Sequence, residues 1–205
     1  MTPRLLTRFG DVFYAYDKPA GMAVHQNSED IPDLVTWLKK QRSLPRDLRP
    51  GHRLDRPTSG VVLCGAGRKA RAQIAAWLEE ADKVYLALVA GTPPAESGAF
   101  NSPLSDARRK RPLDAHTLYQ VKERLGGFTL LELRLVTGRK HQLRRHLADA
   151  GMPVVGDSRY GPKRPVRVPV FPGRLWLHAA CLTLPDRVIT SPLPTGLQQH
   201  LDLLR

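Results

Sequence analysis

The stretch Gly51-His-Arg-Leu-Asp-Arg-Pro-Thr-Ser-Gly60 separates a polar, proline-marked loop from the apolar run Val61-Val-Leu-Cys64. At its centre is Asp55, with His52, Arg53 and Arg56 no more than three residues away. Positive charge close by favours the ionised form of a carboxylate. A surface turn with a solvated ion pair would have the same composition. The stretch by itself therefore leaves both interpretations open, a turn or a carboxylate kept charged for chemistry.

The charge of the whole chain points to a polyanionic partner. Its 205 residues carry 32 Lys and Arg against 19 Asp and Glu, a formal net charge of +13 and a pI near 10.3. Such a balance favours nucleic acid over a membrane surface, because no basic amphipathic helix, lipidation signal or long apolar span accompanies it. The N-terminus lacks the apolar core of a signal peptide, so we expect a cytoplasmic protein. Cys64 and Cys181 stand alone in apolar runs, which predicts reduced core residues and no zinc site.

Strands outnumber helices in the predicted pattern. Helices are predicted from Asp33 onward, over residues 69–80, and up to Gly151. Strands are predicted over residues 12–16, 61–64, 83–91, 115–121, 128–136 and 176–184. The pattern indicates an α+β fold on a mixed, mainly antiparallel sheet with flanking helices, and one domain over residues 1–205.

A second informative stretch, Val136-Thr-Gly-Arg-Lys-His-Gln-Leu-Arg-Arg-His-Leu-Ala-Asp-Ala-Gly151, predicts a strand end followed by a cationic helix start. His141 and His146 are five residues apart with no intervening carboxylate in the metalloprotease position, which argues against a metal site. The four cations at residues 108–111 are either solvated surface or a phosphate contact. Tyr85 lies near the start of a predicted strand, where a half-buried sheet tyrosine is the usual outcome.

Six blocks, taken in order, resemble the RluA-type pseudouridine synthases: residues 17–25, 52–60, 83–91, 138–147, 156–161 and 177–179. The block with Asp55 is similar to that family's catalytic aspartate motif, and Gly138-Arg-Lys-His-Gln-Leu-Arg-Arg-His-Leu147 to its companion arginine motif. The resemblance implies isomerisation of uridine to pseudouridine in ribosomal or transfer RNA. It implies neither a cofactor nor a metal.

The resemblance also assigns roles to residues. It makes Asp55 the nucleophile, Tyr85 the side chain that packs against the target base, with a sugar proton as a second task, and Arg139 the partner of Asp55. Arg53 would fill the place vacated by the flipped base. The expected RNA-binding residues are Arg53, Arg56, Arg108, Arg109, Lys110, Arg111, His141 and Arg144.

Because the first strand and its Lys-Pro-Ala-Gly turn begin almost at once, we expect no separate N-terminal RNA-binding domain, RNA contacts made by the catalytic domain, and a monomer. A different class of protein, a basic RNA-binding or ribosome-associated module without catalysis, fits the charge equally well. The joint presence of Asp55, Tyr85 and Arg139 favours the enzyme. A carboxylate-dependent hydrolase would need a second acid in the matched blocks.

Overall fold

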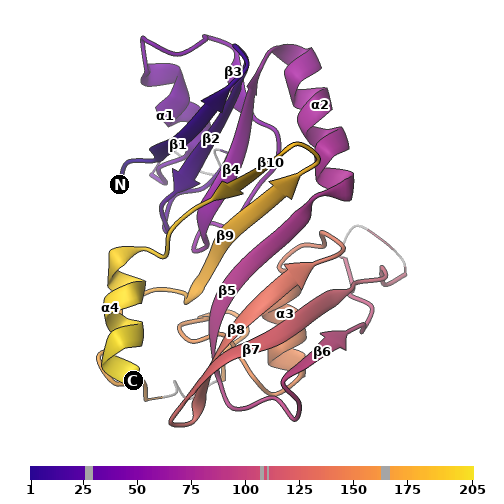
Figure 1. The fold of residues 1–205 in the computed structure, drawn as a ribbon, viewed down its shortest axis with the longest axis vertical. Helices are drawn as coiled ribbons and strands as arrows, with labels where there is room; N and C mark the ends of the chain where they lie inside the picture. Colours follow the sequence, from indigo (N-terminus) through magenta and orange to yellow (C-terminus); the bar gives the residue numbers. More distant parts are fainter. Residues whose placement is uncertain (26–29, 107–108, 110, 163–166) are drawn as a thin grey trace. The chain divides into compact units, whose positions relative to one another are not determined.

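The structure, a computed structural model, describes residues 1–25, 30–106, 109, 111–162 and 167–205. Their contacts form two compact units (Figure 1). The first contains residues 1–82 and 179–192, and the second residues 83–178 and 193–205. Each unit contains antiparallel strands and two helices, which confirms the predicted α+β class.

The first unit is built around a fully buried strand. Strands β1 (Arg4–Phe9), β2 (Phe13–Lys18), β4 (Ser59–Ala66) and β9 (Leu177–Leu184) are neighbours in that order, although β9 begins in the second unit. Strand β3 (Leu48–Pro50) pairs with β4, and β10 (Arg187–Thr190) with β9, both antiparallel. The apolar run of residues 61–64 lies inside β4 and is almost completely buried. This burial explains why the run does not alternate with polar residues.

Two helices belong to the first unit. Helix α1 (Leu34–Lys40) begins where predicted, because the Asp33 carboxylate accepts a hydrogen bond from the Thr36 amide at 2.9 Å. Helix α2 (Gly67–Glu80) packs on β4 and buries Ile74 completely. Cys64 on β4 is completely buried, and this burial raises the pKa of its thiol. It is a free core cysteine, as the sequence indicated.

Gly60 is placed where a side chain has no room. Its φ is +120°, and a Cβ there would lie 2.2 Å from the Ala179 carbonyl oxygen. Gly60→Ala should therefore lower the free energy of unfolding by at least ~1–3 kcal/mol from backbone strain, with the collision adding to it. Urea unfolding measures the change. Gly196→Ala is the control, since a Cβ there meets nothing within 4 Å and the site is helical. Equal midpoints for both variants would contradict this account.

The second unit holds four strands in the order β5 (Asp82–Ala90), β8 (Phe128–Leu135), β7 (Thr117–Leu125) and β6 (Ser97–Phe100). All three pairings are antiparallel. Gly126 and Gly127, with φ of +51° and +92°, form the predicted turn between β7 and β8. Helix α3 (Gln142–Asp149) packs on β7, and α4 (Thr195–Leu204) contributes Leu197 and Leu201 to the same core (Figure 1).

Candidate functional site

The loop that carries Asp55 is fixed at both ends. Before it, the Gly51 amide donates to the Leu63 carbonyl at 2.8 Å, and the Leu63 amide donates to His52 Nε2 at 2.9 Å. After it, the Thr58 amide donates to the Asp55 carbonyl at 3.1 Å, and Thr58 itself is buried. Asp55 is half-buried at the centre of this loop. The arrangement presents one carboxylate on a constrained backbone, which a positioned nucleophile needs.

A fully buried lysine ties the loop of residues 51–58 to another sequence block. Lys18 Nζ donates to the carbonyls of Pro19, Met22 and Arg56, at 2.9, 2.7 and 3.3 Å. The Gly21 amide adds a hydrogen bond to the Arg56 carbonyl at 2.8 Å. A buried ammonium group requires such partners, because leaving it unpaired would be costly. The turn after β2 and the Asp55 loop are therefore held together.

Arg53 and Arg56, both predicted RNA contacts, are exposed on either side of Asp55. Arg53 interacts electrostatically with His25, the last residue of the first sequence block. Desolvation lowers the pKa of His25, the Arg53 guanidinium lowers it further, and Asp33 raises it. The first unit thus combines the proposed nucleophile with two exposed cations.

Tyr85 lies on β5 in the second unit, where its backbone is in register with Leu133 of β8. Its side chain is half-buried and packs against the core of that unit. This is the environment of a sheet tyrosine that keeps part of its ring accessible. A role for Tyr85 in the chemistry stays a prediction.

Arg139, also in the second unit, stands just before α3 on a backbone organised by Gln142. The buried Gln142 amide accepts hydrogen bonds from the Arg139 amide at 3.0 Å and the Thr137 hydroxyl at 2.8 Å. Its nitrogen donates to the His116 carbonyl at 2.9 Å and to Thr117 Oγ1 at 3.0 Å. These contacts hold the segment before α3 against the start of β7. Sequence reasoning missed Gln142; an uncharged amide inside a run of cations was the available signal.

Arg144 occupies a buried ion pair. Its Nε and one terminal nitrogen donate to the two carboxylate oxygens of Asp157, both at 2.7 Å. Burial alone would raise the pKa of Asp157, but the hydrogen bonds from Arg144 and from the Tyr160 and Arg159 amides outweigh it and lower the pKa. Arg144 therefore joins the block at residues 156–161 to α3. Its surroundings give it a structural role, although the sequence suggested an RNA contact.

His141, another expected RNA contact, has a left-handed backbone with φ of 55° at the N-cap of α3. Its Nδ1 lies 2.9 Å from the Tyr160 hydroxyl, and the two rings meet edge to face. It is half-buried. Of the basic run at residues 108–111, Arg109 and Arg111 are exposed, while Arg108 and Lys110 lie outside the described residues.

A basic hollow of about 210 Å³ lies beside Arg139. Among the described residues, the cations that line it are Arg109, Arg139, Lys140 and Arg145, and Asp106 is the acidic residue in the lining. The remaining lining residues are Leu104, Ser105, Leu113 and Gly138. The second unit therefore gathers positive charge where the arginine motif meets the loop before β7.

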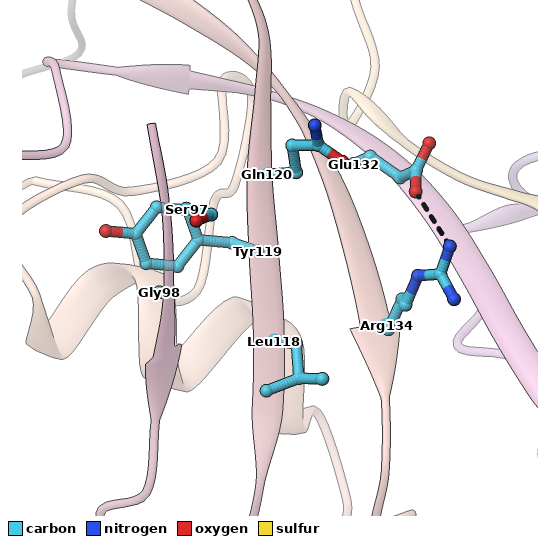
Figure 2. Close-up of a pocket in the computed structure, with 7 residues that line it drawn as sticks. All are labelled: Ser97, Gly98, Leu118, Tyr119, Gln120, Glu132 and Arg134. Carbon is cyan, nitrogen blue, oxygen red and sulfur yellow. Dashed lines mark ion pairs between the residues drawn. The ribbon is translucent and has the colours of Figure 1, made fainter. Parts of the chain in front are cut away.

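A larger hollow, of about 380 Å³, lies on β6, β7 and β8 (Figure 2). Figure 2 shows the Tyr119 ring at Gly98, where an added Cβ would lie 2.7 Å from the ring. Glu132 lies 3.6 Å from Arg134 and 3.6 Å from Lys122, which balances the charge here. None of the described residues that line it belongs to the six sequence blocks, so we assign it no part in the reaction.

Comparison with known proteins places the chain in a family. Residues 12–149 match the family described as RNA pseudouridylate synthase. An uncharacterised RNA pseudouridine synthase of Chloroflexus aurantiacus is 36% identical over 204 residues, covering 89% of this chain and 63% of that protein. Ribosomal large subunit pseudouridine synthase C of Escherichia coli strain K12 is also 36% identical, covering 95% of this chain and 68% of that protein.

The fold agrees with this match. The solved structure of human RNA pseudouridylate synthase domain containing 4 superposes with a TM-score of 0.84 at 24% identity, covering 98% of this chain and 92% of that one. The chain therefore belongs to the RNA pseudouridylate synthase family, a family of isomerases, and the resemblance drawn from the six blocks is confirmed. The chain spans about two thirds of the length of these two curated relatives.

Within the described ranges, no group of three or more His, Cys, Asp or Glu side chains is arranged to hold a metal ion. No helix in that same part of the chain has the length and apolar character needed to cross a membrane.

Proposed function

We propose that this protein isomerises uridine to pseudouridine in RNA, with ribosomal RNA as the leading substrate class and transfer RNA as the alternative. The observation that carries the proposal is the match over residues 12–149, which includes the loop of Asp55. The similarity to a ribosomal large subunit synthase favours ribosomal RNA. The high net positive charge supports a nucleic acid substrate of either kind.

In this proposal Asp55 is the nucleophile. Its carboxylate attacks the sugar or the base, the bond between N1 of uracil and C1′ of ribose breaks, and the base turns while it stays bound. A new bond then forms between C5 and C1′, the carboxylate is released, the C5 proton leaves, and N1 gains a proton in place of its bond to C1′. Substrate and product are isomers, so the balance needs no oxidant, reductant or added group. The held backbone around Asp55 supports the role, because a nucleophile gains most from a fixed position.

Tyr85 and Arg139 have companion roles in the proposal. The partly accessible ring of Tyr85 would stack on the extruded base and help repay the roughly few kcal/mol that unstacking costs. In this proposal its hydroxyl would also take a sugar proton. Arg139 would favour the charged form of the nucleophile when RNA excludes water, because a guanidinium offsets the desolvation of a carboxylate. The hydrogen bond that the Arg139 amide donates to Gln142 Oε1 fixes the Arg139 backbone and supports such a role.

RNA binding completes the proposal. Exposed cations in both units, including Arg53, Arg56, Arg109 and Arg111, supply phosphate contacts. We propose that one catalytic domain, acting as a monomer in the cytoplasm, makes these contacts. Arg144 is not among them, since Asp157 occupies its guanidinium.

Pseudouridine mapping at single-nucleotide resolution tests the proposal. Total RNA from source cells with and without the gene is compared, and the deletion strain is complemented with the intact protein or with Asp55→Ala. Loss of one or a few signals, restored by the intact protein alone, establishes both the reaction and the target uridine. If no signal changes although the gene is expressed, a non-catalytic RNA-binding module becomes the better account.

A further inference from the structure

We propose that the basic hollow beside α3 is a subsite for one phosphodiester group of the RNA, held jointly by Arg109 and Lys140. The inference rests on the proposed function, because it takes RNA as the ligand. It goes further by naming the place, the chemical group and the side chains. The hollow is the one described above, formed by the loop before β7, the residues before α3, and α3 itself.

The size and lining of the hollow favour a phosphate over a base. Its volume of about 210 Å³ is below the ~300–1,000 Å³ of pockets that enclose a drug-sized molecule. None of the described lining residues is aromatic, whereas proteins bind unpaired bases by stacking them on aromatic rings. Four cations face one carboxylate, Asp106, so the charge inside favours an anion.

Hydrogen bonds hold the segments that line the hollow in place. Leu104 and Leu113 exchange two backbone hydrogen bonds, each 2.9 Å, and close the base of the loop between them. Arg145 on α3 donates to the carbonyl and the hydroxyl of Ser105, at 2.9 and 3.1 Å. A second contact with α3 lies just before this loop, because His146 Nε2 is 3.0 Å from the Ser102 carbonyl. The loop and the residues just before it are thus attached to α3 at two points.

The four cations have different tasks. Arg145 is engaged with Ser105, and Arg139 Nε donates to the Asp114 carbonyl at 2.9 Å, so both help to shape the walls. Among the lining cations, Arg109, Arg139 and Lys140 are exposed and Arg145 is half-buried. Of the three exposed ones, Arg139 contacts the Asp114 carbonyl, so we assign the phosphate to Arg109 and Lys140. Because they belong to two different segments that line one small hollow, the loop before β7 and the residues before α3, a single phosphate would be shared between them.

The test is the salt dependence of RNA affinity, which does not depend on turnover. Binding of a labelled, mixed-sequence, single-stranded RNA is titrated at several chloride concentrations for the wild type and for Arg109→Gln/Lys140→Gln. Loss of one shared phosphate contact should lower the log–log slope by ~0.7. Each single variant should weaken binding with a smaller change in slope. A fall of ~1.4 in the double variant would mean separate phosphates and would overturn the shared site.

A matched control removes the same charge elsewhere in the second unit. Lys122→Gln/Arg124→Gln takes two partly exposed cations from β7, which lie 3.6 Å from Glu132 and 2.6 Å from Glu96. Its slope should equal that of the wild type. An equal fall in both double variants would assign the effect to net charge and overturn the subsite.

A second arm separates RNA from a free anion. Thermal unfolding is followed without RNA while inorganic phosphate replaces chloride at constant ionic strength. Stabilisation that disappears in Arg109→Gln/Lys140→Gln, together with an unchanged RNA slope, would assign the hollow to a free anion and overturn the proposal. If the wild type turns over RNA and Arg109→Gln/Lys140→Gln has the wild-type slope, the subsite is rejected and the proposed function stands. If the double variant changes the slope but the wild type shows no turnover, the subsite stands and the proposed function is rejected.

Discussion

Asp55→Asn should abolish pseudouridine formation while RNA affinity stays close to that of the wild type. The amide keeps the shape of the side chain but cannot act as the nucleophile, and removal of a nucleophile can lower kcat by about 10⁴-fold or more. The loop should survive the change, because the hydrogen bonds described above that anchor it use the backbone, His52 and Lys18. Single-turnover conversion of the mapped RNA, with enzyme in excess, measures the effect without interference from product release.

Asp17→Asn is the matched control for this prediction. Asp17 is a partly exposed acid in the same unit, 3.6 Å from Arg4, and lies beside Lys18 in the first sequence block. It should keep turnover near the wild-type rate. Conversion by Asp55→Asn at a rate comparable to this control would remove Asp55 from the nucleophile role. Similar urea midpoints for both variants would exclude unfolding as the cause of any loss.

Local sequence signals predicted much of the fold. The apolar run after Asp55 became the buried β4, and the paired glycines became the turn between β7 and β8. Asp33 caps α1 as expected of an acid before an apolar helical pattern. These features depend on residues close together in the chain, so propensity and periodicity were sufficient.

Helix α4 shows how such a signal can be overlooked. Its apolar residues Leu197, Leu201 and Leu204 follow helical spacing, but the segment follows a proline-marked stretch and carries no catalytic motif. The short strands β1, β6 and β10 were missed for a related reason. Each has four to six residues and is stabilised by a neighbour that sequence patterns do not identify.

The environment of each cation could not be predicted from local composition. Arg144 and Arg145 are adjacent and chemically identical, yet one forms a buried pair with Asp157 and the other holds Ser105. Lys18 is completely buried, and it donates to backbone carbonyls, which no sequence pattern identifies as its acceptors. Some basic residues of the motif blocks therefore stabilise the fold, and partners distant in sequence determine which of them do.

Asp157→Ala should cause a large loss of stability. It leaves the Arg144 guanidinium buried without its carboxylate, and breaking such a pair costs ~3–5 kcal/mol. The amides of Arg159 and Tyr160 lose an acceptor as well. Urea unfolding at neutral pH measures the change. Arg144→Met/Asp157→Leu should regain much of the stability, because replacing both charges by apolar groups removes the unpaired charge.

The same pair predicts how stability depends on pH. The folded pKa of Asp157 is below its ordinary value of 3.8, so its contribution is complete above that value and is lost as the pH falls through the folded pKa. Asp157→Ala should therefore flatten the acid limb of the stability curve. Asp186→Ala is the control: Arg187 also lowers the pKa of Asp186, but Asp186 is fully exposed and solvent screens the pair. Asp186→Ala should unfold at the wild-type urea midpoint. If Asp157→Ala did so as well, the buried pair would not be the contact that holds residues 156–161 against α3.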